Sequence, residues 1–540
     1  MVFSAAKERT DRKETAGERV FVLLAFFCGD GIAALPTRVR SALLAGPVCI
    51  KLGPMRLSLL VFSVMIGFGL VLPAQSAPAR PNVVFILIDD MGWADGGCFG
   101  SKFYDTPHLD RLASEGMRFT DAYASGAVCS PTRAAILTGK APARLHLTDW
   151  IPGEEPPAQS RFRVPDWQEN LPLTEVTIAK ALKRLGYTTA SIGKWHLGGP
   201  AFYPQHQGFD LNVAGGDTGH PTSYFWPYGG RRSVHRVPGL ADRGGRPGEY
   251  LTDRLTDEAL RFIEANKDRP FFLYLAHYAV HAPLMGKEEL VERYSRKPGD
   301  RGQSNAVYAA MIRSVDESVG RILRRLDDRH LAERTMVIVT SDNGGAVHFG
   351  TPPATSNAPL RLGKGYAYEG GLRVPLIVKV PWMTQAGSTC QTPVISQDFF
   401  PTILELAGAG KSAAQTALDG VSLVPLLRSE NNWSRDALFW HYPHYWLGTN
   451  VTPYSVTRVG DWKLIRFYED DHDELYNLRD DIGETTDLAT RRPEKRQELQ
   501  SRLEAWLKQV GAQMPVPMTD AERSRQGKPK AATEKGEEQE

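Results

Sequence analysis

The stretch Asn82-Val83-Val84-Phe85-Ile86-Leu87-Ile88-Asp89-Asp90 is an unbroken apolar run that ends in two acids. Short apolar runs of this kind are typical of strands that are buried on both faces of a parallel sheet. Three further runs have the same character: Thr188–Ile192, Phe271–Leu275 and Met336–Thr340. Helical patterns separate these runs, over Thr106–Glu115, Thr174–Leu185, Leu251–Asn266 and Asn305–Leu326. The alternation predicts an α/β fold, in which helices sandwich a large, mostly parallel sheet.

The length of 540 residues predicts more than one folded part. We assign the α/β domain to residues 80–425. Residues 426–515 differ, because short strands over Tyr454–Val459, Trp462–Phe467 and Glu474–Asn477 precede a helix over Pro493–Val510. This order predicts a smaller antiparallel sheet with one helix. Residues 516–540 are polar and charged, so we expect a disordered tail there.

The N-terminal region predicts export. An apolar run over Leu57–Leu72 follows Arg56 and precedes small residues up to Ala77, which is the pattern of a secretory signal over residues 55–77. A retained membrane anchor is the alternative interpretation. A signal should begin a chain, so we interpret residues 1–54 as a disordered extension or an error in the assigned start, with Met55 as the true start. We expect a periplasmic or extracellular protein.

Charge and cysteine content narrow the function classes. The formal net charge of +2 does not predict a nucleic-acid-binding surface, but it is compatible with a local pocket that binds a small anion. Of the five cysteines, Cys98, Cys129 and Cys390 follow the predicted signal. Three cysteines do not make a disulfide framework. A bridge between Cys98 and Cys390 is one pairing that the sequence alone leaves open, and Cys129 then needs another explanation.

Acidic and amide side chains follow two of the predicted strands. Asp89 and Asp90 end the first strand, and Asp342 and Asn343 follow the strand that ends at Thr340. The carboxyl ends of parallel strands meet at one edge of a sheet. Three carboxylates and an amide oxygen favour a hard divalent cation, calcium or magnesium, over zinc. A solvated turn is the alternative for an isolated Asp-Asp pair.

Cys129 precedes an alanine-rich segment that predicts a helix, and Pro131 suits the first turn of that helix. A helix N-terminus attracts anions, and Arg133 lies one turn along, where its side chain can face the same point. A cysteine at this place is a thiolate nucleophile, a modified residue or a small buried side chain. Nearby acids oppose the thiolate unless a metal ion offsets them.

Two motifs carry a family resemblance: Cys129-Ser130-Pro131-Thr132-Arg133, continued by Ala134 to Gly139, and Gly193-Lys194-Trp195-His196-Leu197-Gly198. Together with the acidic strand ends, they resemble the formylglycine-dependent type I sulfatases of the alkaline phosphatase-like superfamily. The resemblance runs from about residue 81 to 515 and is strongest to bacterial polysaccharide sulfatases and arylsulfatases. It implies an α/β core with a small C-terminal antiparallel sheet.

The resemblance implies that Cys129 is oxidised to Cα-formylglycine. A formylglycine-generating enzyme or an anaerobic sulfatase-maturing enzyme is the implied partner. The hydrated aldehyde has one oxygen to attack sulfur and a second to expel the sulfate, so that one difficult step becomes two. The implied metal is calcium, with magnesium as the alternative, and the implied ligands are Asp89, Asp90, Asp342, Asn343 and the modified residue 129.

The resemblance also assigns roles to basic residues. Arg133 and Lys194 stabilise the charged diol oxygen, and Lys364 binds sulfate oxygens with the metal. His281 protonates the leaving alcohol as general acid, and His196 takes the diol proton that releases sulfate. Taken singly, each of these residues is more commonly a surface lysine or a structural histidine.

Other residues are candidates for the substrate pocket: Asp217, His220, Asn357, Arg361 and His444. We expect a sulfuric ester hydrolase that acts on a sulfated sugar of galactose or N-acetylgalactosamine type, or on an aryl sulfate. The alternative is a phosphomonoester or phosphonate hydrolase of the same superfamily. A non-enzymatic binding protein would lack the nucleophile or a metal ligand, and Cys129, Asp89, Asp90, Asp342 and Asn343 are all present.

Overall fold

The computed structural model describes residue 78 and residues 80–526, except 158–159, 230–236, 241–242 and 410–416. The predicted signal at 55–77, the extension at 1–54 and residues 527–540 lie outside the described residues. The described residues belong to one compact unit, without a separation at the predicted boundary between residues 425 and 426.

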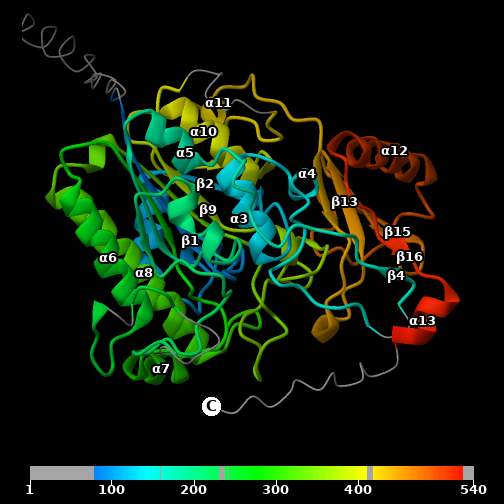
Figure 1. Cartoon of the computed structure of the whole chain (residues 1–540), viewed down its shortest axis with the longest axis horizontal. Helices are drawn as coiled ribbons and strands as arrows, with labels where there is room; N and C mark the ends of the chain where they lie inside the picture. The colour runs from blue at the N-terminus through cyan, green and yellow to red at the C-terminus, as the bar shows by residue number, and fades with distance from the viewer. Residues whose placement is uncertain are drawn as a thin grey trace, which may run out of the picture. The chain divides into compact units, whose positions relative to one another are not determined.

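An eight-stranded sheet forms the centre of the fold (Figure 1). Its strands, in spatial order, are β10 (Ser388–Cys390), β2 (Met117–Phe119), β9 (Leu376–Lys379), β8 (Thr335–Ser341), β1 (Asn82–Ile88), β7 (Phe271–Ala276), β5 (Thr188–Gly193) and β6 (Leu211–Val213). Strand β9 runs antiparallel to both of its neighbours, and the other pairs in this sheet are parallel. The predicted mostly parallel sheet is therefore confirmed.

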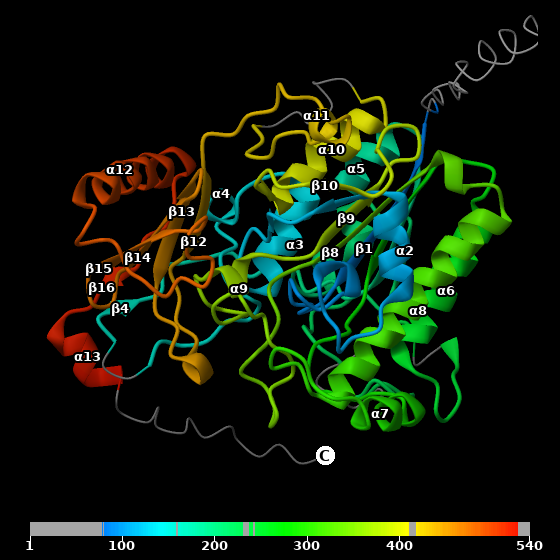
Figure 2. The same ribbon diagram turned by 180° about the vertical axis from the view of Figure 1, so that it is seen from behind.

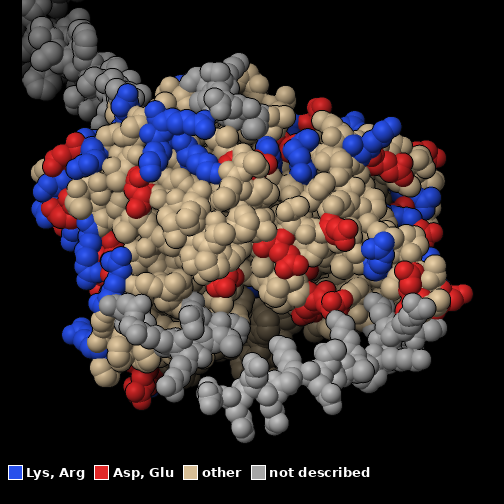
Figure 3. Space-filling model, in the orientation of Figure 1, with Lys and Arg blue, Asp and Glu red and all other residues tan. Residues whose placement is uncertain are grey.

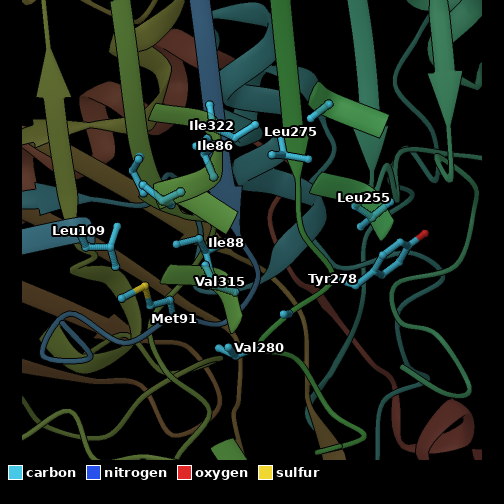
Figure 4. Packing of buried hydrophobic residues seen from close by; sticks show 14 of the residues in the cluster. Ile86, Ile88, Met91, Leu109, Leu255, Leu275, Tyr278, Val280, Val315 and Ile322 are labelled. Carbon is cyan, nitrogen blue, oxygen red and sulfur yellow. The ribbon is translucent and has the colours of Figure 1, made fainter. Parts of the chain in front are cut away.

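Helices cover both faces of this sheet (Figures 1 and 2). Alternate residues of β1 point to opposite faces, and all seven are buried. One face packs against α2 (Pro107–Glu115), α6 (Leu251–Ala265) and α8 (Ala306–Asp328). Figure 4 shows Ile86 and Leu275 of the sheet beside Leu255, Val315 and Ile322 of these helices. The other face packs against α3 (Cys129–Thr138), α5 (Ile178–Arg184) and α10 (Phe399–Leu406).

A four-stranded antiparallel sheet follows near the C-terminus, as predicted. Its order is β12 (Leu438–Tyr442), β13 (Tyr454–Val459), β14 (Trp462–Phe467) and β15 (His472–Asn477). Helix α12 (Pro493–Val510) packs on β13 and β14. Trp440 and Tyr454 of this sheet share a core with Tyr123 and Leu372. The small sheet is therefore fixed to the larger part of the fold by buried apolar contacts.

Short elements complete the described chain: β3 (Ala122–Tyr123), α4 (Pro142–Leu145), α7 (Glu288–Ser295), α9 (Glu369–Leu372), β11 (Val394–Ile395) and α11 (Val424–Leu427). The structure differs from the predicted tail over residues 516–526. Strand β16 (Val516–Pro517) pairs with β4 (Phe162–Arg163), and α13 (Asp520–Gln526) follows. A distant pairing partner fixes this polar segment, and local composition does not reveal such a partner.

Cys98, Cys129 and Cys390 are free cysteines, so the bridge between Cys98 and Cys390 that the sequence left open is not formed. Among the described residues, no helix has both the length and the apolar composition that crossing a bilayer requires.

Candidate active site

The parallel strands bring their terminal polar residues to one edge of the sheet. Ile88 of β1 lies opposite Ser341 of β8, so the next residues, Asp89 and Asp342, emerge side by side. The backbone N–H of Asp90 donates a hydrogen bond to Asp342 Oδ1 at 3.2 Å. Lys194 follows β5 at the same edge. The convergence that the sequence predicted therefore exists.

The backbone takes unusual conformations at this edge. Asp90 and His196 have φ values of 62° and 58°, in the left-handed region that costs free energy for residues other than glycine. Gly193 has a φ of 101°, and a Cβ built there would lie 1.9 Å from the carbonyl oxygen of Ala276. Such conformations persist only where surrounding contacts impose them, and they are common at functional sites.

Helix α3 presents Cys129 to these carboxylates. Cys129 is the first residue of α3 and is 2% exposed. Its Sγ lies 3.7 Å from Asp89 Oδ1. One turn along, the Arg133 guanidinium donates to Asp342 Oδ2 through Nε at 2.9 Å and through Nη2 at 2.7 Å. The helix therefore places a thiol and a cation against the acids of two strands.

Three cations match the three carboxylates. Arg133 pairs with Asp342, Lys194 Nζ lies 2.7 Å from Asp89 Oδ2, and Lys364 Nζ lies 2.7 Å from Asp90 Oδ1. These six side chains are between 0% and 4% exposed. With all six groups ionised, the three negative and three positive charges sum to zero, so the fully ionised cluster carries no excess charge with which to attract an anion.

The carboxylates titrate unequally. Burial raises the pKa of Asp89 to about 8, although Lys194 opposes this rise. Burial also acts on Asp90 and Asp342, but Lys364 and Arg133 hold the pKa of these two acids below the usual range. Burial raises the pKa of the Cys129 thiol to about 12, with Lys194 and Lys364 opposing the rise. The unmodified thiol is therefore neutral and a poor nucleophile at neutral pH.

The arrangement fits a divalent cation. Asn343 Nδ2 donates to Asp90 Oδ1 at 2.7 Å, while the buried Asn343 Oδ1 has no hydrogen-bond partner. Ligand atoms of Asp89, Cys129 and Asp342 lie within 4.8 Å of one another. Because a buried polar oxygen is normally paired, the unpaired Asn343 Oδ1 beside three carboxylates suits a hard metal ion.

Two histidines line the same cavity as Cys129, and they use different ring nitrogens for their hydrogen bonds. His196 Nε2 donates to the Ile151 carbonyl oxygen at 2.5 Å, so Nδ1 carries the lone pair and has no partner. His281 Nδ1 donates to the Ala282 carbonyl oxygen at 2.7 Å, and its Nε2 lies 3.6 Å from Asp90 Oδ2. Each ring therefore keeps one nitrogen available for a proton-transfer role.

A cavity of about 560 Å³ opens onto this cluster. Its lining includes the predicted residues Cys129, His196, Asp217, His220, His281 and Lys364. The remaining lining residues were not predicted: Trp150, Ile151, Pro152, Glu154, Thr218, Gly219, Phe349 and Trp446. The aromatic residues among them lie far apart in the sequence, so no local motif marks them.

Three predicted substrate residues do not line the cavity. Asn357 Nδ2 donates to the carbonyl oxygens of Gly345, Leu362 and Gly370, at distances between 2.8 and 3.2 Å, and so holds the loop that carries Lys364. Arg361 donates to Tyr476 Oη at 3.1 Å and to the Glu484 carbonyl oxygen at 2.8 Å. His444 is 1% exposed and hydrogen-bonds Thr148 Oγ1 at 2.8 Å. The hydrogen bonds of these three side chains are therefore made within the protein, although the buried Asn357 Oδ1 has no hydrogen-bond partner.

Comparison with known proteins agrees with this geometry. The sulfatase family model matches residues 81–409, and the model of the N-sulphoglucosamine sulphohydrolase C-terminal region matches residues 362–513. A sulfatase of Formosa agariphila is 33% identical and covers 83% of this chain and 93% of its own length. Human N-acetylgalactosamine-6-sulfatase is 34% identical over 70% of this chain and 74% of its own length.

Comparison with solved structures also finds proteins with the same fold. The crystal structure of Ps i-CgsB in complex with k-i-k-neocarrahexaose aligns with a TM-score of 0.67 and 28% identity, over 83% of this chain and 96% of that one. A phosphonate monoester hydrolase of Agrobacterium radiobacter shares the fold, with a TM-score of 0.61 and 21% identity over 80% of this chain and 96% of that one. With two family models and relatives spanning most of its length, the chain belongs to the sulfatase family of the alkaline phosphatase-like superfamily.

Proposed function

We propose that this sulfatase removes sulfate from a sulfated sugar of galactose or N-acetylgalactosamine type, or from an aryl sulfate, after residue 129 has been converted to formylglycine. The observation that carries the proposal is the position of Cys129. It begins a buried helix, contacts the acids of the sheet edge and lines the cavity. A neutral thiol has little nucleophilic power there, whereas an aldehyde hydrate needs no ionised sulfur.

A separate enzyme carries out this conversion in our proposal. The partner is a formylglycine-generating enzyme or an anaerobic sulfatase-maturing enzyme, which supplies the oxidant. Because α3 is buried in the folded protein, we place the oxidation before folding is complete, during export. The mature protein is then periplasmic or extracellular.

Asp89, Asp90, Asp342, Asn343 and residue 129 would hold a divalent cation, calcium in our proposal, with magnesium as the alternative. When bound, this cation supplies the positive charge that the fully ionised cluster lacks for a sulfate group. Lys364 lines the cavity beside Asp90 and is the protein cation placed to contact the sulfate oxygens. Arg133 and Lys194 lie behind residue 129 and stabilise negative charge on its side-chain oxygen.

Each of the two histidines carries out one proton transfer. His196 Nδ1 accepts a proton from the side chain of residue 129, because its Nε2 is committed to the Ile151 carbonyl oxygen. His281 Nε2 donates a proton to the leaving alcohol. Burial and the Lys364 ammonium lower the pKa of His281 to about 3. The negative charge of a bound ester acts in the opposite direction and favours the imidazolium.

A sugar fits the remainder of the cavity. Trp150, Phe349 and Trp446 supply aromatic faces, while Asp217 and His220 supply hydrogen-bonding groups. Relatives are named N-acetylgalactosamine-6-sulfatase, and the solved relative Ps i-CgsB is in complex with k-i-k-neocarrahexaose. These names support, for this chain, a ring of the galactose series.

The test is the release of inorganic ions from matched substrates. Purified metal-loaded protein from a host that makes the maturing enzyme should hydrolyse 4-nitrophenyl sulfate at least about 100-fold faster than 4-nitrophenyl phosphate, by kcat/KM. Sulfate should also be released from defined sulfated galactose-type sugars. A preference for the phosphate, or for a phosphonate monoester, would instead identify the alternative hydrolase.

A further inference from the structure

The charged residues that line the cavity change sign along its depth. At the inner end, Lys364 is the lining residue with a cationic side chain, and its side chain is 4% exposed. Toward solvent, the charged lining residues are the partly exposed Glu154 and the exposed Asp217. Both are carboxylates, which carry negative charge at neutral pH.

Neither outer carboxylate is neutralised by the described part of the chain. Glu154 Oε2 accepts a hydrogen bond from the Leu447 backbone N–H at 2.7 Å, and Asp217 Oδ1 accepts one from Tyr203 Oη at 3.3 Å. No lysine or arginine among the described residues lies within ion-pair distance of Glu154 or Asp217. By contrast, the acids at the inner end all have cationic partners. Among the described residues, the two carboxylates of the outer cavity therefore have no cation that offsets their charge.

Glu154 is well placed to act on a bound sugar. It lies four residues after Trp150, and its hydrogen bond to Leu447 connects it to the segment of Trp446. Both tryptophans line the cavity. A sugar ring held against these aromatic faces lies near a carboxylate that accepts hydrogen bonds from neutral hydroxyl groups. The same carboxylate repels any further anion on that ring.

Figure 3 shows where charged side chains lie on one face of the molecule. On the face in Figure 3, several Asp and Glu side chains lie toward the middle, near a hollow low in the view. Lys and Arg lie mainly nearer the edges of that face. Such an arrangement does not attract a highly charged polyanion to the middle of the face.

We propose that Glu154 and Asp217 form a charge filter, which makes this sulfatase selective for a sugar that carries one sulfate and no second anionic group. The proposal rests on the proposed function and narrows its substrate class. The sulfate enters the inner end, where Lys364 lies, and the neutral hydroxyl groups face the two acids. A second sulfate or a carboxylate on the same sugar would lie near uncompensated carboxylates, and the repulsion would select against it.

The test compares two substrates that differ by one anion. These are N-acetylgalactosamine with a single sulfate at O6 and the same sugar with a second sulfate at O4, and the release of the O6 sulfate is measured. Wild-type enzyme should have the higher kcat/KM for the monosulfated sugar. Glu154→Gln keeps an acceptor for Leu447 and removes the charge. It should raise the ratio of disulfated to monosulfated kcat/KM about fivefold, the size of one partly screened repulsion. Asp217→Asn should act in the same direction.

Two controls separate a failure of the charge filter from a failure of the proposed function. Glu155→Gln removes the same charge from the next residue, which does not line the cavity, and should leave the ratio unchanged. In wild type, the discrimination should also narrow as ionic strength rises, because salt screens exposed charges. The charge filter would be overturned if the enzyme is active but the ratio of disulfated to monosulfated kcat/KM stays the same in Glu154→Gln, in Asp217→Asn and at high salt. If wild type cleaves neither sugar sulfates nor aryl sulfates, it is the proposed function that fails.

Discussion

At the scale of single residues, a substitution at His220 tests whether the outer cavity recognises a sugar. Its ring stacks on that of His281, with centroids 5.6 Å apart and planes 4° from parallel. A small aryl sulfate reaches the inner end without filling the outer cavity. We expect His220→Ala to lower kcat/KM at least about tenfold more on a sulfated sugar than on an aryl sulfate. His206→Ala, at an exposed position outside the cavity, is the control. Equal losses on both substrates would remove His220 from the sugar site.

The buried carboxyl of Asp149 should make the stability of the folded protein depend on pH. Burial raises the pKa of this carboxyl to about 8. Its Oδ1 accepts hydrogen bonds from Tyr442 Oη at 2.9 Å and the Trp150 backbone N–H at 2.8 Å. Its Oδ2 has no hydrogen-bond partner and lies 3.6 Å from Nδ1 of His444, whose pKa is lowered by burial. The folded state therefore holds a proton that the unfolded chain releases near pH 4. The contribution of Asp149 to stability should therefore fall as pH rises from about 4 to 8, because at this carboxyl the unfolded state binds fewer protons in this window.

Asp149→Asn removes this titration and keeps an acceptor oxygen. Its stability advantage over wild type should be absent near pH 4 and should grow to about 4 kcal/mol at pH 7, at about 1.4 kcal/mol for each pH unit. Tm measured across this pH range checks the result, with the exposed Asp166→Asn as the control. A difference in Tm that does not change with pH would show that Asp149 is ionised in the folded protein.

At the scale of elements, the end of β5 positions Lys194. The Lys194 backbone N–H donates to the Ala276 carbonyl oxygen at 2.7 Å, and this oxygen would lie 1.9 Å from a Cβ at Gly193. Gly193→Ala should therefore displace Lys194 from Asp89 and lower kcat/KM at least tenfold, with a loss of about 1–3 kcal/mol of stability. Gly199→Ala is the matched control, because its Cβ would meet no atom within 4 Å. Full activity in Gly193→Ala would refute this role for the strand end.

The elements also show what can be inferred from the sequence. The apolar run of β1 and the helical period of α6 predicted those elements to within one residue, because burial imposes a pattern on each. The sheet edge followed from a general rule on where parallel strands end. Strand β9 lies in the apolar run Leu376-Ile377-Val378, which was not predicted as a strand, and its antiparallel direction depends on its neighbours. The pairing of β16 with β4 depends on a distant partner and left no local pattern. The roles of Ile151 and Glu154 likewise follow only from the folded contacts.

At the scale of the whole molecule, a buried ion network connects the C-terminal sheet to the larger α/β part. Lys463 Nζ lies 3.0 Å from Glu369 Oε1 and 2.8 Å from Glu484 Oε1, and all three side chains are at most 1% exposed. Lys463→Met would leave two buried acids without this cation. We expect a loss of about 3–5 kcal/mol in the free energy of unfolding, measured with urea.

Lys495→Met is the control for this network, because Lys495 pairs with Glu498 in a partly exposed ion pair on α12. Its cost should stay below about 1 kcal/mol. If Lys463→Met costs no more than this control, apolar packing rather than the ion network joins the two sheets.

The activity that we propose for the whole molecule depends on the chemical identity of residue 129. Mass spectrometry of the peptide containing this residue, from protein produced in its native host, tests that identity directly. We predict a mass in which the thiol has been replaced by an aldehyde, together with reaction of the peptide with a hydrazide. An intact cysteine at position 129 in fully active enzyme would contradict the account.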